Sequence, residues 1–403
     1  MVYPATAAER PFTIREPRTL NPGPVAFGLA ALALGATYLT AAFGWRQGTL
    51  FVIGAAAGVC LYHASFGFTS AWRQLIVERR GAAVRAQVLM LAAASLVFFP
   101  ALASGHLFGQ AVRGSVSPVG VSVIVGAFLF GVGMQLGGSC ASGTLYTSGG
   151  GNTRMLVTLA AFVAGSVIGI RHIAWWEKTP ALKPISLVAS LGLWTALAAT
   201  FVLFAAIVMA TWVIERRGAR ETIDPNRSAG GNRFLHGPWP LAAGALGLAA
   251  VNIATLLVAG RPWGVTGAFA LWGSKALEAA GANVAAWPYW STPARTAELH
   301  ASVFKDITSV MDFGIMLGAL AAAGFAGRFA PTWRVPGRSL AAAVIGGLLL
   351  GYGARIAYGC NIGALFSGIA SSSVHGWLWL VAAFFGNIAG TALRPFFGLR
   401  IRT

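Results

Sequence analysis

Charged residues are scarce in this sequence. Lys, Arg, Asp and Glu together make up 10% of its 403 residues, whereas a soluble domain carries roughly 25%. Hydrophobic residues make up 56%, and apolar runs of about 20 residues recur along the whole length. Most of the chain therefore faces something other than water.

Acidic residues are the scarcest charged group: 11 Asp and Glu stand against 29 Lys and Arg, for a net charge of +18. The basic residues lie mostly between the apolar runs, where they mark cytoplasmic loops and contact anionic lipid. We therefore expect the lipid bilayer, and no nucleic acid, as a partner. A basic vestibule would also attract an anionic solute.

Cysteine is rare, and the three present, Cys60, Cys140 and Cys360, all lie in apolar context. The sequence has no CxxC motif and no Cys/His ligand spacing, so neither a metal site nor a cofactor is expected. A catalytic triad, a paired acid and base, and a Walker or Rossmann motif in suitable context are also missing. These absences predict a protein that is not an enzyme.

Long apolar runs predict an all-α integral membrane protein. Lys and Arg are more frequent on the side of the N-terminus, which favours both termini inside a bacterial inner membrane that the chain crosses many times. Residues 1–23 lack an apolar core and are predicted to be a cytoplasmic tail. The ten predicted spans are 24–43, 49–65, 84–103, 118–136, 155–173, 185–213, 238–260, 308–328, 339–356 and 375–394.

An internal repeat relates the two halves of the chain. Residues 131–143 read GVGMQLGGSCASG and residues 351–363 read GYGARIAYGCNIG, with both glycines of GxG, the cysteine and the last glycine at a constant offset of 220. An aromatic-Gly-x-Thr-small-Ala motif precedes each, at 66–71 and 263–268. Downstream, Gly165 and Gly169 match Gly386 and Gly390 after one inserted residue. Ordered motifs in both halves make a chance match improbable.

Five spans in each half is an odd number, so the second half is expected to insert upside down. Inverted repeats of this kind recur in transporters and place the solute site at the midplane. The first membrane repeat is predicted at 24–175 and the second at 185–395. The second contains a cytoplasmic loop, 214–237, and an extramembrane insertion, 281–307, on the face opposite the termini.

The stretches after Cys140 and Cys360 are too short and too polar to serve as ordinary loops across a bilayer. We expect each helix to stop at the motif glycines and a short re-entrant helix to follow, so that two Gly-rich hairpins meet at the midplane. Ser142 or Asn361 can cap the next half-helix, whose N-terminus favours an anion. The candidate solute-binding residues in these breaks are Gly138, Ser139, Cys140, Ser142, Gly359, Cys360 and Asn361.

Polar residues inside apolar runs add further candidates. Arg355 is a membrane-embedded charge, read either as part of an anion site or as snorkelling to lipid headgroups. Its counterpart in the first half is Gln135. Thr69 and Thr266 belong to the two aromatic-Gly motifs, which precede helical segments 68–78 and 266–280. For Asp312, near the start of a span, coupling-ion binding and interfacial placement are both open.

At these motifs the chain resembles the YeeE/YedE family of sulphur-compound (thiosulfate) transporters, over most of residues 50–395. The resemblance implies re-entrant hairpins from both faces and central cysteines that handle thiosulfate or a related sulphur anion. Some members function with a small TusA-like sulphur-carrier protein at the cytoplasmic side. Members usually carry another cysteine in an F-C-F-like motif, where this chain has Gly67; Cys60, seven residues earlier, is the candidate substitute.

The leading hypothesis is a transporter that passes thiosulfate, or a related small sulphur-containing anion, between central cysteines. The alternative is a membrane sulfurtransferase or sulphur sensor, in which a thiolate attacks the soft sulphur of thiosulfate, keeps it as a persulfide and releases sulfite. Sulfite and selenium oxyanions are the alternative substrates.

Overall fold

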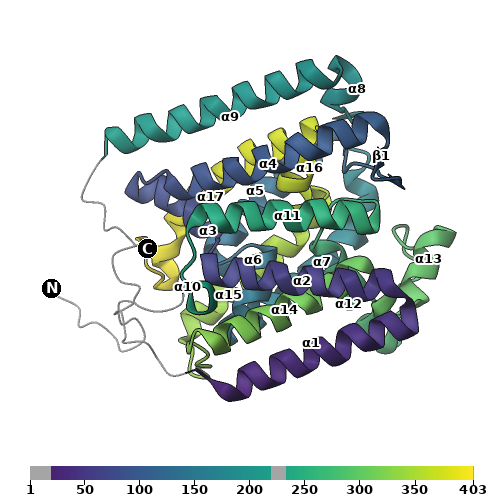
Figure 1. Ribbon diagram of the computed structural model, residues 1–403, viewed down its shortest axis with the longest axis vertical. Coiled ribbons are helices and arrows are strands. Elements are labelled where there is room, and N and C mark those ends of the chain that lie inside the picture. Colours follow the sequence, from purple (N-terminus) through teal and green to yellow (C-terminus); the bar gives the residue numbers. More distant parts are fainter. Residues whose placement is uncertain (1–19, 219–232, 403) are drawn as a thin grey trace.

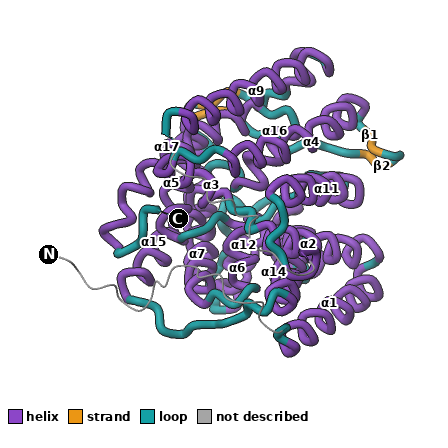
Figure 2. Tube along the Cα trace, turned by 60° about the vertical axis from the view of Figure 1, so that its left-hand side comes forward, coloured by secondary structure: helices purple, strands orange, loops and turns teal. Residues whose placement is uncertain are grey.

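The computed structural model describes residues 20–218 and 233–402, and these form a bundle of helices (Figures 1 and 2). The described part of the first half contains α1 (Pro22–Phe43), α2 (Trp45–Ala64), α3 (Phe68–Arg73), η1 (Gln74–Glu78), α4 (Ala82–Ser104), β1 (His106–Leu107), β2 (Gln110–Ala111), β3 (Val119–Gly120), α5 (Val121–Gly137), α6 (Ala141–Gly149), α7 (Thr153–Trp176) and β4 (Ala181–Leu182). The described part of the second half contains α8 (Leu187–Leu191), α9 (Leu193–Arg216), α10 (Arg233–His236), α11 (Leu241–Ala259), α12 (Thr266–Ala279), α13 (Pro293–His300), η2 (Val303–Lys305), α14 (Ile307–Phe325), α15 (Gly337–Ile356), η3 (Asn361–Phe366), α16 (Ser367–Ala370), α17 (Val374–Leu393) and η4 (Arg394–Phe397).

The chain is a multi-pass membrane protein. Within the described residues, ten helical segments are long and apolar enough to cross a bilayer, which confirms the ten predicted spans. The sixth begins at Leu193 rather than at 185, because Gly192 adopts a positive φ of 79° and separates the short α8 from α9. Residues 1–19 of the predicted tail and 219–232 of the predicted loop lie outside the described residues.

The bundle has a core of broken helices between two peripheral ones. Helices α1 and α9 lie at opposite margins in Figure 1, and only 17% of the most apolar part of each is buried. Their exposed leucine, valine and phenylalanine side chains therefore face lipid. The fourth and ninth spans, which carry the two cysteine motifs, are 67% and 56% buried in the same measure.

Pairs of helices from opposite halves make the central contacts. Helix α5 packs on α17 and α15 packs on α7; likewise α2 packs on α14 and α4 on α11. Motif glycines permit these close approaches: a Cβ at Gly131 would lie 2.2 Å from the carbonyl oxygen of Ala383, and one at Gly351 would lie 2.2 Å from that of Phe162. Each contact has a counterpart when the two halves are exchanged.

The ends of the bundle differ. Helix η4 lies at one end, whereas α8, α13 and the β1–β2 hairpin lie at the other (Figure 1). The described residues of the 281–307 insertion pack on α12 through a small cluster that includes Val284, Trp290 and Leu299, all of which are buried.

Candidate functional site

Both cysteine motifs interrupt a long helix. In the first half, α5 ends at Gly137, and Gly138 turns the chain with a φ of 91°. In the second half, Tyr358 and Gly359 have φ values of 57° and 148° after α15 ends. A short helix follows each turn, α6 in the first half and the π-helix η3 in the second. The predicted interruptions are therefore present in both halves.

Cys140 and Cys360 occupy the same backbone position, immediately before the second helix. Each is buried, with 2% and 0% of its surface exposed, and the carbonyl oxygen of each accepts an amide hydrogen bond of 2.8 Å from the residue four positions later. Helices α6 and η3, which begin directly after the two cysteines, are in contact. The two repeat cysteines thus lie at the starts of neighbouring helices.

The predicted capping roles are wrong. The N-cap positions are held by Cys140 and Cys360, without a side-chain cap bond. Ser142 lies inside α6, and its Oγ is 3.6 Å from the Cys140 Sγ. Asn361 is buried, and neither its Oδ1 nor its Nδ2 has a hydrogen-bond partner among the described residues. Ser139, directly before Cys140, is 8% exposed.

A cavity of about 270 Å³ lies beside Cys360. Gly359 and Gly363, on either side of the cysteine, form part of its wall. The backbone at the start of α12, including Thr266, forms another part, so amide N–H groups and the positive end of the helix dipole lie at the cavity. The cavity lining also includes Arg113, Arg261, Arg355, Thr308 and Tyr358.

Three arginines line this cavity, and their combined charge makes it suitable for an anion. Arg355 donates from Nη1 to the Tyr289 hydroxyl at 3.3 Å, and its buried Nε has no partner among the described residues. The side chain therefore lies at the cavity and contacts the 281–307 insertion.

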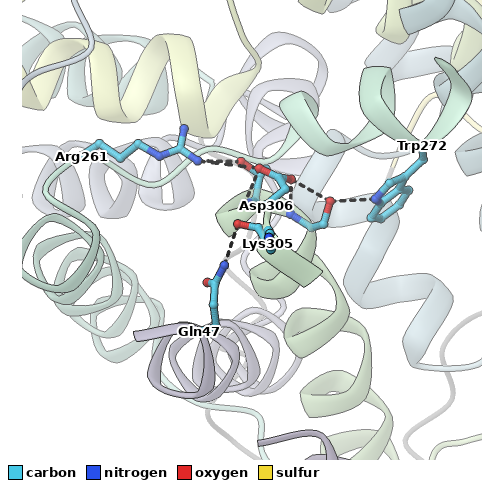
Figure 3. A network of polar contacts seen from close by, with 7 residues as sticks. Gln47, Arg261, Trp272, Lys305 and Asp306 are labelled. Carbon is cyan, nitrogen blue, oxygen red and sulfur yellow. Dashed lines mark hydrogen bonds and ion pairs between the residues drawn. The ribbon is translucent and has the colours of Figure 1, made fainter. Parts of the chain in front are cut away.

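A polar network holds Arg261 in place (Figure 3). Its Nη2 donates to the Thr308 hydroxyl at 3.3 Å and lies 4.0 Å from the Asp306 carboxylate. Asp306 also caps α14, because it accepts the Ser309 amide at 2.8 Å and the Ser309 hydroxyl at 2.7 Å. Ser309 in turn accepts a 2.8 Å hydrogen bond from the Trp272 indole.

The same network reaches α2. Gln47 donates from Nε2 to the Lys305 carbonyl oxygen at 2.6 Å (Figure 3). The start of α14 is thus fixed by α2 on one side and by α12 on another. This rigidity holds Arg261 and Thr308 at the cavity wall.

Glu298 on α13 adds a negative charge near the arginines. Partial burial raises the pKa of its carboxyl, and the Asp306 carboxylate raises it further, whereas Arg261, Arg295 and Arg355 oppose the shift. A raised carboxyl pKa means that Glu298 gains its negative charge at a higher pH than an exposed glutamate does.

The corresponding polar residue of the first half is buried in a hydrogen-bond network. Gln135, the counterpart of Arg355, is fully buried and donates to the Thr69 carbonyl and to the Asn387 side chain, at 3.1 and 2.7 Å. It also accepts a 3.2 Å hydrogen bond from Arg73. Gln135 and Thr69 are therefore not brought to the cavity with Arg355 and Thr266.

Cys60 lies apart from the cavity lining. It is half-buried on α2, and a Cβ at Gly247 of α11 would lie 2.9 Å from its Sγ. The Cys60 thiol therefore packs at the α2–α11 contact.

Several residues of the cavity were missed by sequence reasoning. Arg261 lies two residues before the WGVT motif, and this position was a usable signal. Arg113 lies in a loop between spans, and Thr308 lies at a helix start. Neither the spacing nor the context of these two residues connects them to the cysteine motif in sequence.

Comparison with known proteins agrees with these features. Residues 63–389 match the family model described as sulphur transport. The chain is 27% identical to the thiosulfate transporter TsuA of Spirochaeta thermophila over 84% of this chain and 96% of that protein. It is 22% identical to TsuA of Escherichia coli, over 83% and 91% of the two chains. It is 34% identical to the probable transporter YedE of Escherichia coli, but this match spans only 36% of either chain.

Proposed function

Because the chain belongs to the sulphur transport family, we propose that it carries thiosulfate, or a closely related sulphur anion, across the bacterial inner membrane. The cavity beside Cys360 carries this proposal. Three arginines and the start of α12 line it. The hard oxygens of a doubly charged anion suit the arginines and the amide groups of α12. Its one soft sulphur suits the cysteine thiol.

The cavity arginines and amide groups receive the oxygens through charge-assisted hydrogen bonds. The S–H groups of Cys360 and Cys140 then donate weak hydrogen bonds to the terminal sulphur in turn. The contact between α6 and η3 supports this relay, since it leaves no long gap between the two motifs. Cys60 packs at the α2–α11 contact, apart from the cavity, and takes no part in the route that we propose.

The architecture that serves the relay is a pair of inverted repeats with re-entrant hairpins. The helix contacts that recur when the two halves are exchanged support this architecture. A polar contact that occurs once in each half extends the correspondence. Arg154 donates to the Gly137 carbonyl at 2.6 Å, and the His375 ring nitrogen lies 2.9 Å from the carbonyl oxygen of Ala357. In each half, a residue at the start of the next span contacts the end of the broken helix. Gly137 is the last residue of α5, and Ala357 is the C-cap of α15.

The repeats correspond to 24–175 and 185–395, with both termini and the loop 214–237 on the cytoplasmic side. The insertion 281–307, and with it the cavity, then faces outward. The position of α13 at the end opposite η4 supports this orientation. A small TusA-like sulphur-carrier protein at the cytoplasmic face is the partner that this orientation would serve.

Uptake of ³⁵S-thiosulfate into proteoliposomes that contain the purified protein tests the proposal. Unlabelled thiosulfate should compete strongly and sulfate weakly, while competition by sulfite and selenite defines the substrate range. Mass spectrometry of the protein after thiosulfate exposure separates transport from sulfurtransfer. Transport leaves the cysteine masses unchanged, whereas a persulfide adds one sulphur atom. Absence of protein-dependent uptake would refute the transport function.

A further inference from the structure

Asp312 on α14 is a buried carboxyl that the proposed thiosulfate route leaves unused. It has no exposed surface, and neither carboxyl oxygen has a hydrogen-bond partner among the described residues. An acidic side chain in the middle of a membrane protein is expensive to keep there, so its presence calls for a role.

The position of Asp312 connects the outer cavity with the cysteine helices. Thr308, Asp312 and Met316 are spaced four residues apart, so they follow one face of α14. Thr308 lines the cavity. The Met316 carbonyl oxygen lies 2.2 Å from where a Cβ at Gly149, the last residue of α6, would be. Asp312 therefore lies one helical turn inside the cavity wall, on the way to the helix that begins after Cys140.

The chemistry of this site favours a proton over a metal cation. A proton needs only the carboxyl itself, whereas among the described residues no group of three or more His, Cys, Asp or Glu side chains could hold a metal ion. An ionised carboxylate without a partner is strongly disfavoured in such surroundings, so the carboxyl holds a proton in this state.

We propose that Asp312 is the proton-binding site that couples proton entry to anion entry. This inference rests on the proposed function. Asp312 takes one proton from the outer side, holds it while the anion occupies the cavity, and releases it to the inner side with the anion. One proton per cycle reduces the net charge carried with a dianion from −2 to −1, which lowers the electrical work against an inside-negative potential.

Other titratable groups on the elements packed against α14 have identified surroundings or partners. His63 on α2 stacks with Trp239, and Glu278 on α12 pairs with His300. The remaining titratable or basic groups on these elements are Tyr38, Arg46, Cys60, Tyr62, Tyr146, Lys275, Lys305 and His236. Asp312 differs from Glu278 in that its carboxyl is fully buried and has no partner among the described residues, which makes Glu278 a suitable control.

The test uses the full chain in proteoliposomes with the membrane potential clamped, a pH dye inside, and thiosulfate as the probe. Two measurements are made: exchange of ³⁵S-thiosulfate at equal concentrations on both sides, and acidification of the lumen when thiosulfate is added outside. Wild type should do both. Asp312→Asn should keep exchange but lose acidification and pH-driven accumulation, while Glu278→Gln should behave as wild type.

The outcomes separate the two proposals. Exchange by wild type without acidification, or unchanged acidification by Asp312→Asn, would overturn proton coupling and leave thiosulfate transport intact. Absence of exchange by wild type would overturn transport itself and the coupling with it. If Asp312→Asn does not fold, the wild-type acidification still decides whether protons are coupled. Asp312→Glu, which keeps a carboxyl, then assigns the site if it retains acidification with a shifted pH dependence.

Discussion

The two halves of the molecule use related motifs in opposite ways. In the second half, Thr266 and Arg355 lie at an open cavity, and the Arg355 Nε has no partner among the described residues. In the first half, the Gln135 side chain is buried and donates to the Thr69 carbonyl and to Asn387 while it accepts from Arg73, although the buried Thr69 hydroxyl has no partner among the described residues. A side chain whose hydrogen bonds are already made stabilises the fold, whereas a donor without a partner at a cavity wall is available to a ligand. The comparison therefore separates a region built for binding from one built for packing.

The largest expected effect falls on the residues that the halves share. Cys140→Ala and Cys360→Ala should each abolish or strongly reduce thiosulfate uptake, because a methyl group offers neither an S–H donor nor a thiolate. The folded state should lose only about 1 kcal/mol, since the side chains are small. Uptake in proteoliposomes and thermal unfolding in detergent measure the two effects.

Cys60→Ala is the matched control and should be mild, because its thiol packs at the α2–α11 contact. Cys→Ser at the repeat positions keeps a donor but hardens it. Partial uptake would then favour a hydrogen-bond relay, and none would favour covalent transfer. Normal uptake by the Ala variants at Cys140 and Cys360, with normal expression, would show that the mechanism does not depend on sulphur chemistry.

Arg355→Gln should have the next largest effect, because it gives the second half the residue that the first half has. Loss of a charged donor at the cavity should weaken thiosulfate binding by about tenfold or more. Isothermal titration measures the change. Arg171→Gln is the control. The Arg171 guanidinium is exposed, lies over the Trp287 ring and does not belong to the lining of this cavity. Equal affinity for Arg355→Gln and wild type would remove Arg355 from the binding site.

Gln135→Ala should have the opposite profile. It leaves Arg73 and Asn387 short of a buried partner, so we expect a loss of about 1–3 kcal/mol in stability with little change in thiosulfate affinity. A lowered midpoint in thermal unfolding, together with an unchanged titration, would support the division between the halves. A large loss of affinity at unchanged stability would contradict it.

Glu298→Gln should have the smallest effect. The Glu298 carboxylate repels an anion that approaches Arg355 and Arg261, so its removal should tighten thiosulfate binding by roughly twofold at neutral pH. Because the Glu298 pKa is raised, the residue is neutral below that pKa and charged above it. The difference from wild type should therefore grow as pH rises and vanish at low pH. A pH series of titrations checks this, and a constant difference would exclude Glu298 as its source.

Much of the architecture was readable from sequence because membrane helices leave a strong hydropathy signal. Ten spans and both helix breaks follow from apolar run length and glycine spacing. The cavity was only partly readable. Arg355 and Thr266 belong to motifs, and Arg261 lies two residues before one, but Arg113 reaches the cavity through tertiary packing, which no local pattern encodes. The choice of Cys rather than Ser142 or Asn361 as N-cap residue also depends on backbone geometry after the turn.

The π-helix η3 accounts for a detail of how the two halves diverged. The offset between them is 220 residues up to Gly363 but 221 at Gly386, so the second half gained one residue in between. A π-helical turn takes up an added residue by widening, which leaves the helices on either side in register. The amide of Leu365 indeed bonds to the Cys360 carbonyl oxygen, five residues back, at 3.2 Å. A single-codon insertion can thus be absorbed within one turn, without displacing α17 from its contact with α5.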